Sequence, residues 1–410
     1  MSEMTKEKVF TPTIIVCLLA SCLTAGNTSF NVLLSSLAAE FPNASPLMIS
    51  LMGVFPNLFG IGVPLILGAF VGRKIGYKPV MIACMILYVI GGCGPILFHG
   101  SYLLLLVFRG LYGIGVAGLA IRLTIIIIYY KDLSLRSRVM GYSLFVSNIA
   151  GVILSPVVGV ISDKFGVFPA FGIFAIGIIP LVITVLMFED PYDKAKAAGE
   201  LPKEEGEKKA KGKFRPVALF YIIFNGVCML LQMQYQLNIS FWVEKCELGT
   251  AAQTGIILSM FTVGGMVGGL LCGNLFTKTK RFSYAIYGLM MTVGMALVYF
   301  IHSIPVFCIG GFLVGFAVTG YSVATKICYG ATTDATTVNF ANGLSTACGY
   351  GGLFLSAFLT PVFYKIGGDV SGSFICSAVI LAVITIAFFV VNPLPREIRE
   401  QLDSDEAAKE

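Results

Sequence analysis

Three cationic side chains stand out because they lie in segments that are otherwise apolar enough to cross a membrane. Arg109 and Arg122 interrupt the run VFRGLYGIGVAGLAIRLTIIIIYY (residues 107–130), and Lys326 lies in a similar apolar run. An arginine near the centre of a membrane helix costs about 2.5–3.5 kcal/mol on insertion scales. A guanidinium can hold a carboxylate through two hydrogen bonds. The chemistry that these residues offer is therefore the binding of an anion.

No acidic side chain lies at the same depth to neutralise these cations, because all 22 Asp and Glu residues fall in tails, loops or helix ends. Arg109 and Arg122 are separated by about 140° around an ideal helix, so they cannot both face one cavity squarely. We expect Arg109, the deeper of the two, to contact the anion. We expect Arg122 to extend to lipid headgroups or to a loop acid. For Lys326 an interfacial role and a site role are equally open.

The elements that must position these residues are membrane helices. The 410-residue chain is 57% hydrophobic and 12% charged, whereas soluble domains are about 25% charged. Its apolar runs have the length of about 20 residues that a helix needs to cross a bilayer. We expect twelve membrane helices, near residues 12–36, 46–71, 78–98, 102–130, 138–161, 166–188, 214–237, 251–276, 282–301, 305–330, 339–364 and 371–392.

The distribution of basic residues predicts the orientation. If both termini are cytoplasmic, the inner segments hold 22 Lys and Arg residues and the outer loops hold three. Such an excess marks the cytoplasmic side. We therefore expect a multi-pass protein of the plasma membrane. Its expected parts are a six-helix bundle (1–188), a cytoplasmic charged linker (189–213), a second six-helix bundle (214–392) and a cytoplasmic tail (393–410).

The two halves repeat one another in sequence. The segment SDKFG (162–166) is similar to YKIGG (364–368), and at the same spacing Gly151 aligns with Gly352. Transporters built from such repeats bind their substrate near the membrane midplane, between the halves. The sequence thus predicts an all-α membrane protein: twelve transmembrane helices in two pseudo-symmetric six-helix bundles around a central cavity.

Helical spacing selects the side chains that would line this cavity. Amide stripes recur at equivalent places in the first and seventh helices, and polar stripes follow in the fifth and tenth. Polar side chains in membrane helices also serve as packing contacts, which is the alternative interpretation. Two tyrosines could stack on a ring of the substrate. With Arg109, the expected substrate-binding residues are Asn27, Asn31, Gln232, Gln236, Lys326, Asn148, Tyr321 and Tyr350.

Several short motifs give the chain a resemblance to a known family. GAFVGRKIGYKPV (68–80) and its degenerate copy GNLFTKTKRF (273–282) follow the second and eighth expected helices, RGLYGIG (109–115) lies in the fourth and GVILSPVVG (151–159) in the fifth. The whole chain resembles the major facilitator superfamily of secondary transporters. The resemblance implies roles in conformational change for Arg73, Lys74, Gly76, Lys78, Gly273, Lys278, Arg281, Gly151, Pro156 and Gly159. Arg73 stands where the family usually has Asp.

The expected function is secondary active transport of a small organic anion by alternating access, as exchange or export. The alternatives are a proton-coupled multidrug exporter and a ligand sensor that transports nothing. The absence of a P-loop motif argues against direct use of ATP. We expect no enzymatic activity, no metal, no cofactor and no nucleic-acid partner, and we expect a monomer in the lipid bilayer.

Overall fold

A computed structural model describes residues 11–130, 132–197, 216–333, 337–395 and 398–399. Within these ranges the chain is almost entirely helical and contains no β-strand. The N-terminal bundle comprises α1 (Pro12–Cys22), α2 (Gly26–Asn31), α3 (Leu34–Glu40), α4 (Pro46–Phe70), α5 (Tyr77–Leu97), α6 (Tyr102–Gly118), α7 (Ile121–Tyr129), α8 (Leu133–Phe165), α9 (Val167–Ala170) and α10 (Ile178–Met187). A short helix, α11 (Pro191–Ala197), follows this bundle.

The C-terminal bundle has longer and less interrupted helices. They are α12 (Pro216–Lys245), α13 (Ala251–Thr279), α14 (Ser283–Phe300), α15 (Ile304–Thr332), α16 (Val338–Gly367) and α17 (Ser371–Val390). The expected linker lies outside the described residues from 198 onwards, and so does most of the expected tail.

Twelve helical passages are thus present in the described residues, as expected from the apolar runs, but several are interrupted. The first passage runs from α1 to α3 and contains the 3₁₀ turn Leu23–Ala25. The fourth is divided between α6 and α7, next to Leu119 and Ala120. Residues 251–300 form one continuous apolar stretch that the 3₁₀ turn Lys280–Phe282 divides into α13 and α14.

Local sequence explains where the passages begin. The hydroxyl of Ser45 accepts a hydrogen bond from the Met48 amide, and Pro46 occupies the first turn of α4. Both features favour a helix start, since the cap satisfies a free amide and proline has none to satisfy. Thr250 and Gln253 form a reciprocal capping box at the start of α13.

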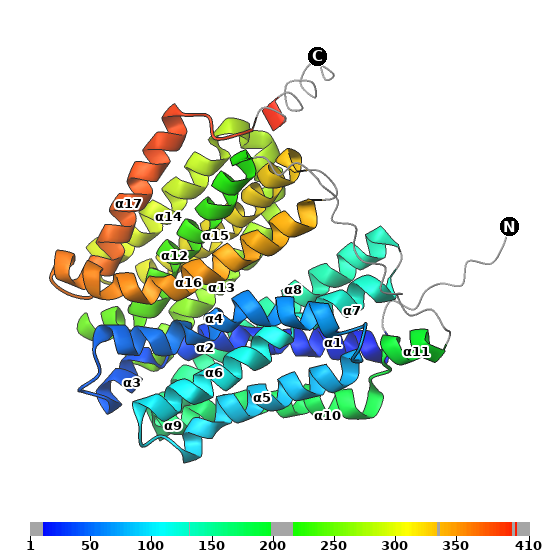
Figure 1. Cartoon of the computed structure of the whole chain (residues 1–410). Coiled ribbons are helices and arrows are strands. Elements are labelled where there is room, and N and C mark those ends of the chain that lie inside the picture. The colour runs from blue at the N-terminus through cyan, green and yellow to red at the C-terminus, as the bar shows by residue number, and fades with distance from the viewer. Residues whose placement is uncertain (1–10, 131, 198–215, 334–336, 396–397, 400–410) are drawn as a thin grey trace.

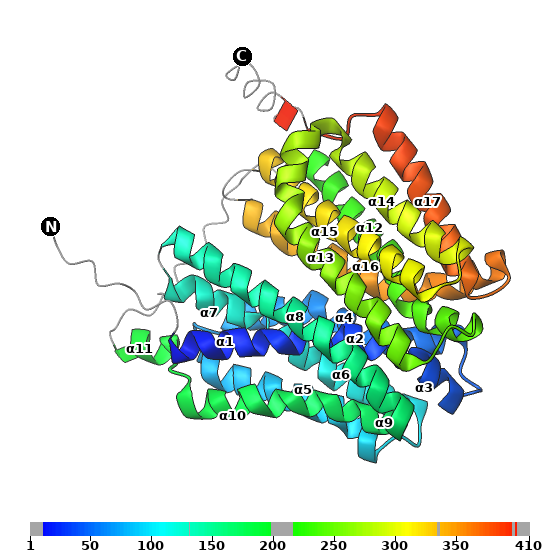
Figure 2. The ribbon, with the colours of Figure 1, turned by 180° about the vertical axis from the view of Figure 1, so that it is seen from behind.

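The two bundles meet at one end and diverge toward the other (Figures 1 and 2). We call the end where α8 finishes and α13 begins the closed end. The opposite end, where α1 and α8 begin, is the open end. At the closed end a Cβ atom on Gly159 would lie 2.3 Å from the Ala251 carbonyl oxygen, and one on Gly255 would lie 2.5 Å from the Ser155 carbonyl oxygen. These four residues, which we call the α8–α13 seam, bring two backbones together because the glycines have no side chain.

Asp163 continues the seam beyond these glycines. Its carboxylate accepts hydrogen bonds from the Thr250 hydroxyl (2.6 Å), the Ala252 amide (3.0 Å) and the Ala251 amide (3.2 Å). The negative side chain of one bundle therefore caps the N-terminus of a helix in the other, where the helix dipole favours it.

Candidate functional site

A hollow of about 260 Å³ lies on the inner face of the C-terminal bundle, among α12, α15 and α16. We call it the cationic hollow, since Lys326 is the one charged residue that lines it. Its lining is Asn225, Met229, Ser322, Lys326, Ser345, Thr346, Gly349, Tyr350 and Leu353. The sequence predicted Lys326 and Tyr350 as site residues, and the structure brings these two together.

Lys326 is exposed and makes no hydrogen bond or ion pair with any residue that the structure describes. The polar groups around it are fixed by their own contacts. The Asn225 carboxamide donates to the Ser345 carbonyl oxygen (3.4 Å) and accepts from the Ser322 hydroxyl (3.3 Å). An ammonium group with free donors thus faces a preorganised polar wall. This arrangement suits an incoming anion, since a charge-assisted hydrogen bond is stronger than a neutral one.

Tyr350 connects this hollow to the N-terminal bundle. Its ring lies so close to Gly60 of α4 that a Cβ atom there would be 2.7 Å from it. The Tyr350 hydroxyl also lies within electrostatic range of the Arg122 guanidinium. Lys326 shares the hollow with Tyr350, and Arg122 of the N-terminal bundle interacts electrostatically with the Tyr350 hydroxyl.

The expectation that Arg122 extends to lipid headgroups is wrong. Arg122 is only 8% exposed, and its guanidinium donates to the Ser21 hydroxyl (3.0 Å) and to the Leu119 carbonyl oxygen (2.8 Å). These partners come from α1 and from the break between α6 and α7. They satisfy a buried cation without a carboxylate, so the side chain need not reach the interface to be hydrated.

Arg109 is buried inside the N-terminal bundle, with 2% of its surface exposed. It donates to the Met52 carbonyl oxygen and to the Asn27 side-chain oxygen, both at 2.8 Å. Its guanidinium carbon lies 3.6 Å from the centre of the Phe30 ring and 4.8 Å from that of Tyr112. In this conformation Arg109 fixes Asn27 and joins three helices, and it has no direct access to the hollow.

The predicted amide stripes lie on α2 and α12, which pack against each other across the two bundles. Gln232 and Gln236 are hydrogen-bonded to one another at 2.8 Å. Asn31 is completely buried, and neither its side-chain nitrogen nor its side-chain oxygen has a partner among the described residues. These amides therefore line the interface between the bundles, away from the cationic hollow.

The remaining two predicted site residues, Tyr321 and Asn148, lie apart from each other, and neither lines the cationic hollow. Tyr321 is completely buried in the C-terminal bundle, where it contacts the rings of Phe224, Tyr284 and Tyr287. Asn148 lines a second hollow of about 460 Å³ between α8 and α13.

The predicted loop motifs mainly organise each bundle internally. A side chain at Gly76 would collide with Asp190, whose carboxylate accepts a hydrogen bond from the Lys78 amide at 2.8 Å. Asp190 thereby joins the region after α10 to the start of α5. Arg73 and Lys74 lie exposed in the preceding turn.

In the second copy of the loop motif, Arg281 approaches the Phe389 carbonyl oxygen at 3.5 Å, whereas Gly273 and Lys278 are exposed. The motif 151–159 acts between the bundles. Gly159 belongs to the seam and Pro156 packs on Gly255, while a Cβ atom at Gly151 would lie 3.2 Å from Thr262.

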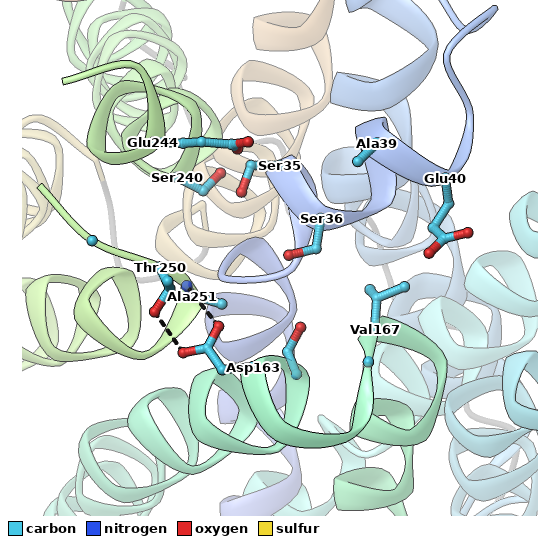
Figure 3. A pocket seen from close by; sticks show the side chains of 13 residues that line it. Ser35, Ser36, Ala39, Glu40, Asp163, Val167, Ser240, Glu244, Thr250 and Ala251 are labelled. Atoms are coloured by element: carbon cyan, nitrogen blue, oxygen red, sulfur yellow. Dashed lines mark hydrogen bonds between the residues drawn. The ribbon is translucent and has the colours of Figure 1, made fainter. Parts of the chain in front are cut away.

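A third hollow, of about 370 Å³, lies at the closed end between the two bundles (Figure 3). Glu40 and Asp163 face it from the N-terminal bundle and Glu244 from the C-terminal bundle. Ser240 also lines it and is 1% exposed, and its hydroxyl has no partner among the described residues. This acidic hollow is remote from Lys326. The acidic residues and the cationic residue therefore line different hollows.

Comparison with known proteins places this geometry in a family. A family model described as Major Facilitator Superfamily matches residues 16–245 and 229–409. A curated relative, the Probable sulfoacetate transporter SauU of Cupriavidus necator, is 27% identical over an alignment of 254 positions. The alignment covers 56% of this chain and 57% of the relative. The chain thus matches little more than half the length of that relative.

Two solved structures share the fold at low sequence identity. A bacterial homologue of the human lysosomal transporter Spinster, in an inward-facing and unoccupied conformation, aligns with a TM-score of 0.68 and 13% identity over 93% of this chain and 96% of that chain. The peptide transporter POT in complex with alafosfalin aligns with a TM-score of 0.68 and 13% identity over 91% and 93%. With twelve helical passages in two bundles and a family match along nearly all of its length, the chain belongs to the Major Facilitator Superfamily of multi-pass membrane transporters.

Proposed function

We propose that this chain is a secondary active transporter that carries an organic anion by alternating access. The observation that carries the proposal is Lys326, an ammonium group without a described partner in a hollow on the inner face of the C-terminal bundle. The name of the curated relative, a probable sulfoacetate transporter, supports a substrate with sulfonate or carboxylate groups. We assign transport and no catalysis to the chain.

The proposed contacts come from both bundles. Lys326 and Asn225 would bind the anion from the C-terminal side, and Arg122 would bind it from the N-terminal side, across Tyr350. An anion held between two cations attracts both, so its binding would draw the bundles together at the open end. This is the movement that rocking of one repeat against the other requires. Arg109 would act indirectly by holding Asn27 in place.

Charge also bears on direction and coupling. For an anion that enters a cell with a negative interior, the membrane potential imposes a cost of about 2.3 kcal/mol per charge for each 100 mV. The membrane helices contain no acidic residue at depth that could carry a proton with the substrate. We therefore propose exchange of one anion for another, or export. Uptake into proteoliposomes that follows an imposed pH gradient, with no counter-anion inside, would contradict exchange.

The substrate class can be tested on the purified protein. Its thermal unfolding would be recorded with sulfoacetate, malonate, sugars, amino acids and drug-like cations. We expect the anions alone to raise the melting temperature. Lys326→Gln should weaken anion binding by about 10- to 150-fold, since a hydrogen bond to a charged group contributes about 1.5–3 kcal/mol. Lys365→Gln removes the same charge from an exposed position outside the hollow and is the matched control. Stabilisation by neutral or cationic compounds instead would indicate the multidrug exporter.

The proposed location is the plasma membrane, with both termini and the charged linker in the cytoplasm and the chain acting as a monomer. Single cysteines at position 205 and at Cys246 test the orientation, in a background without the other native cysteines. A membrane-impermeant maleimide added to intact cells should label Cys246 and spare position 205. Labelling at position 205 would reverse the orientation.

A further inference from the structure

The hollow of about 460 Å³ between α8 and α13 differs from the cationic hollow because no charged residue lines it and ten of its fourteen lining residues are apolar or glycine. We call it the apolar hollow. The lining residues are Thr28, Gly141, Leu144, Phe145, Asn148, Phe261, Thr262, Gly265, Met266, Gly269, Leu270, Gly315, Val318 and Thr319. Both bundles contribute to it, and it lies where α8 and α13 diverge on the open side of the seam.

The space exists because glycines occupy positions where larger residues would fit. A Cβ atom at Gly269 would meet only Thr319, at 3.9 Å, and one at Gly141 would meet nothing within 4 Å. Helix packing therefore does not require these glycines. Glycine in a helix interior costs about 1 kcal/mol relative to alanine. The two glycines keep open a space that the fold could otherwise fill at no steric cost.

The apolar and cationic hollows are both lined by residues of α15. Thr319 lines the first and Ser322 the second, and three residues of separation place them on one face of the helix. The larger hollow, of about 460 Å³, lies within the range of about 300–1,000 Å³ that ligand pockets occupy, and the smaller, of about 260 Å³, lies just below it. Seven residues separate Lys326 from Thr319, so a molecule bound at Lys326 has the apolar hollow about two helical turns away along the same helix face.

We infer that the transported anion is amphipathic: its anionic head contacts Lys326 and its hydrocarbon or aromatic part fills the apolar hollow. The inference rests on the proposed function and narrows its substrate class. The proposed ligand space then has two parts: Lys326 lines one hollow, and the side chains of Phe145, Phe261 and Met266 are among those that line the other. A small, fully polar dianion would leave this second part of the space unused.

Chain length provides the test. Binding to the protein in lipid nanodiscs would be measured for acetate, butyrate, hexanoate and octanoate. The same lengths would be measured as alkyl trimethylammonium salts and as alcohols, which report nonspecific partitioning. Burial of each methylene contributes about 0.8 kcal/mol, so affinity should rise about threefold to fourfold per methylene until the hollow is full. The rise in the carboxylate series should exceed the rise that partitioning into lipid produces in the alcohol and trimethylammonium series.

A variant tests whether the rise in affinity with alkyl chain length comes from binding in the apolar hollow. Gly269→Leu fills it and should abolish the gain from butyrate to octanoate while acetate binding stays unchanged. Leu271→Phe adds volume to the exposed surface of the same helix, outside the lining, and should change neither. An unchanged length dependence in Gly269→Leu would overturn the inference and assign the hollow to membrane lipid.

Two further outcomes separate this inference from the proposed function. If sulfoacetate and malonate bind tightly and affinity is independent of alkyl length, the inference is wrong and anion transport stands. If no anion of any length binds, the proposed function fails, and the inference fails with it.

Discussion

Removing the carboxylate of Asp163 should shift the conformational equilibrium toward the state in which the two bundles separate where α8 finishes and α13 begins. Asp163 is the side chain of the N-terminal bundle that accepts three hydrogen bonds from the first residues of α13, in the C-terminal bundle. These contacts cannot survive separation of the bundles at that end. Asp163→Ala would therefore destabilise the present conformation relative to its opposite.

The magnitude follows from the type of contact. A side-chain cap contributes about 0.5–2 kcal/mol, and a negative charge near a helix N-terminus about 0.3–1 kcal/mol when exposed. Asp163 is exposed to water, so the lower part of these ranges applies. A loss of about 1 kcal/mol changes the ratio of the two conformations about fivefold, since about 1.4 kcal/mol corresponds to tenfold.

Ser240 supplies the assay. It lines the hollow at the closed end and is only 1% exposed, so it is accessible only after the bundles separate there. A cysteine at this position, in a background without native cysteines, would be labelled with a membrane-impermeant maleimide applied from the closed-end side. The labelling rate should rise about fivefold when Asp163→Ala is added.

Glu40→Ala is the matched control. It removes a carboxylate that lines the same hollow and has no hydrogen-bond partner among the described residues. It should leave the labelling rate unchanged. Equal rates in the parent and in Asp163→Ala would refute the reasoning. An equal rise in both variants would also refute it, because the rise would then not depend on the capping contact.

Three further outcomes are expected. Arg122→Gln should reduce anion affinity about as strongly as loss of Lys326, as measured by thermal shift, and normal affinity would remove Arg122 from the site. Arg109→Gln should lower the melting temperature, because a buried partner left unsatisfied costs about 1–3 kcal/mol, and should affect affinity less. Partial burial raises the pKa of the Asp369 carboxyl, but hydrogen bonds from Lys245 and Ser371 outweigh it and the pKa falls below 3.8. The stabilisation is complete above about pH 4 and lost as pH falls through the lowered value, so the melting temperatures of the parent and Asp369→Asn should differ at pH 7 and converge in strong acid.

The helical architecture could be predicted because its signals lie within single segments. Apolar runs of sufficient length identify a membrane helix wherever it occurs, and the repeated spacing of polar residues indicates two related halves. The breaks within passages were not predictable in the same way. The interruption next to Leu119 and Ala120 contains no proline, and the contact between Arg122 and the Leu119 carbonyl oxygen cannot be read from the sequence, which there predicts a continuous helix.

The arrangement of the candidate residues could be predicted only in part, because helical spacing gives the direction of a side chain but does not identify its neighbours. Lys326 shares a face with Ser322, and both line the cationic hollow. Tyr321 is adjacent to Ser322 in sequence and therefore points about 100° away, into an aromatic core that its own segment does not reveal. Arg122 could not be placed because its partner Ser21 lies on another helix and cannot be identified from the spacing along one segment.

The α8–α13 seam has a consequence for experiments on the transport cycle. At Gly159 and Gly255 the opposing atoms are backbone atoms, which cannot rotate aside as a side chain can. A single methyl group at either position would therefore act as a wedge between the bundles at one end while leaving every polar contact of the other end intact. Gly159→Ala would then be a one-residue conformational trap. It offers a way to crystallise or image the chain in the conformation in which the bundles are separated at this end, which the protein would otherwise adopt only during transport.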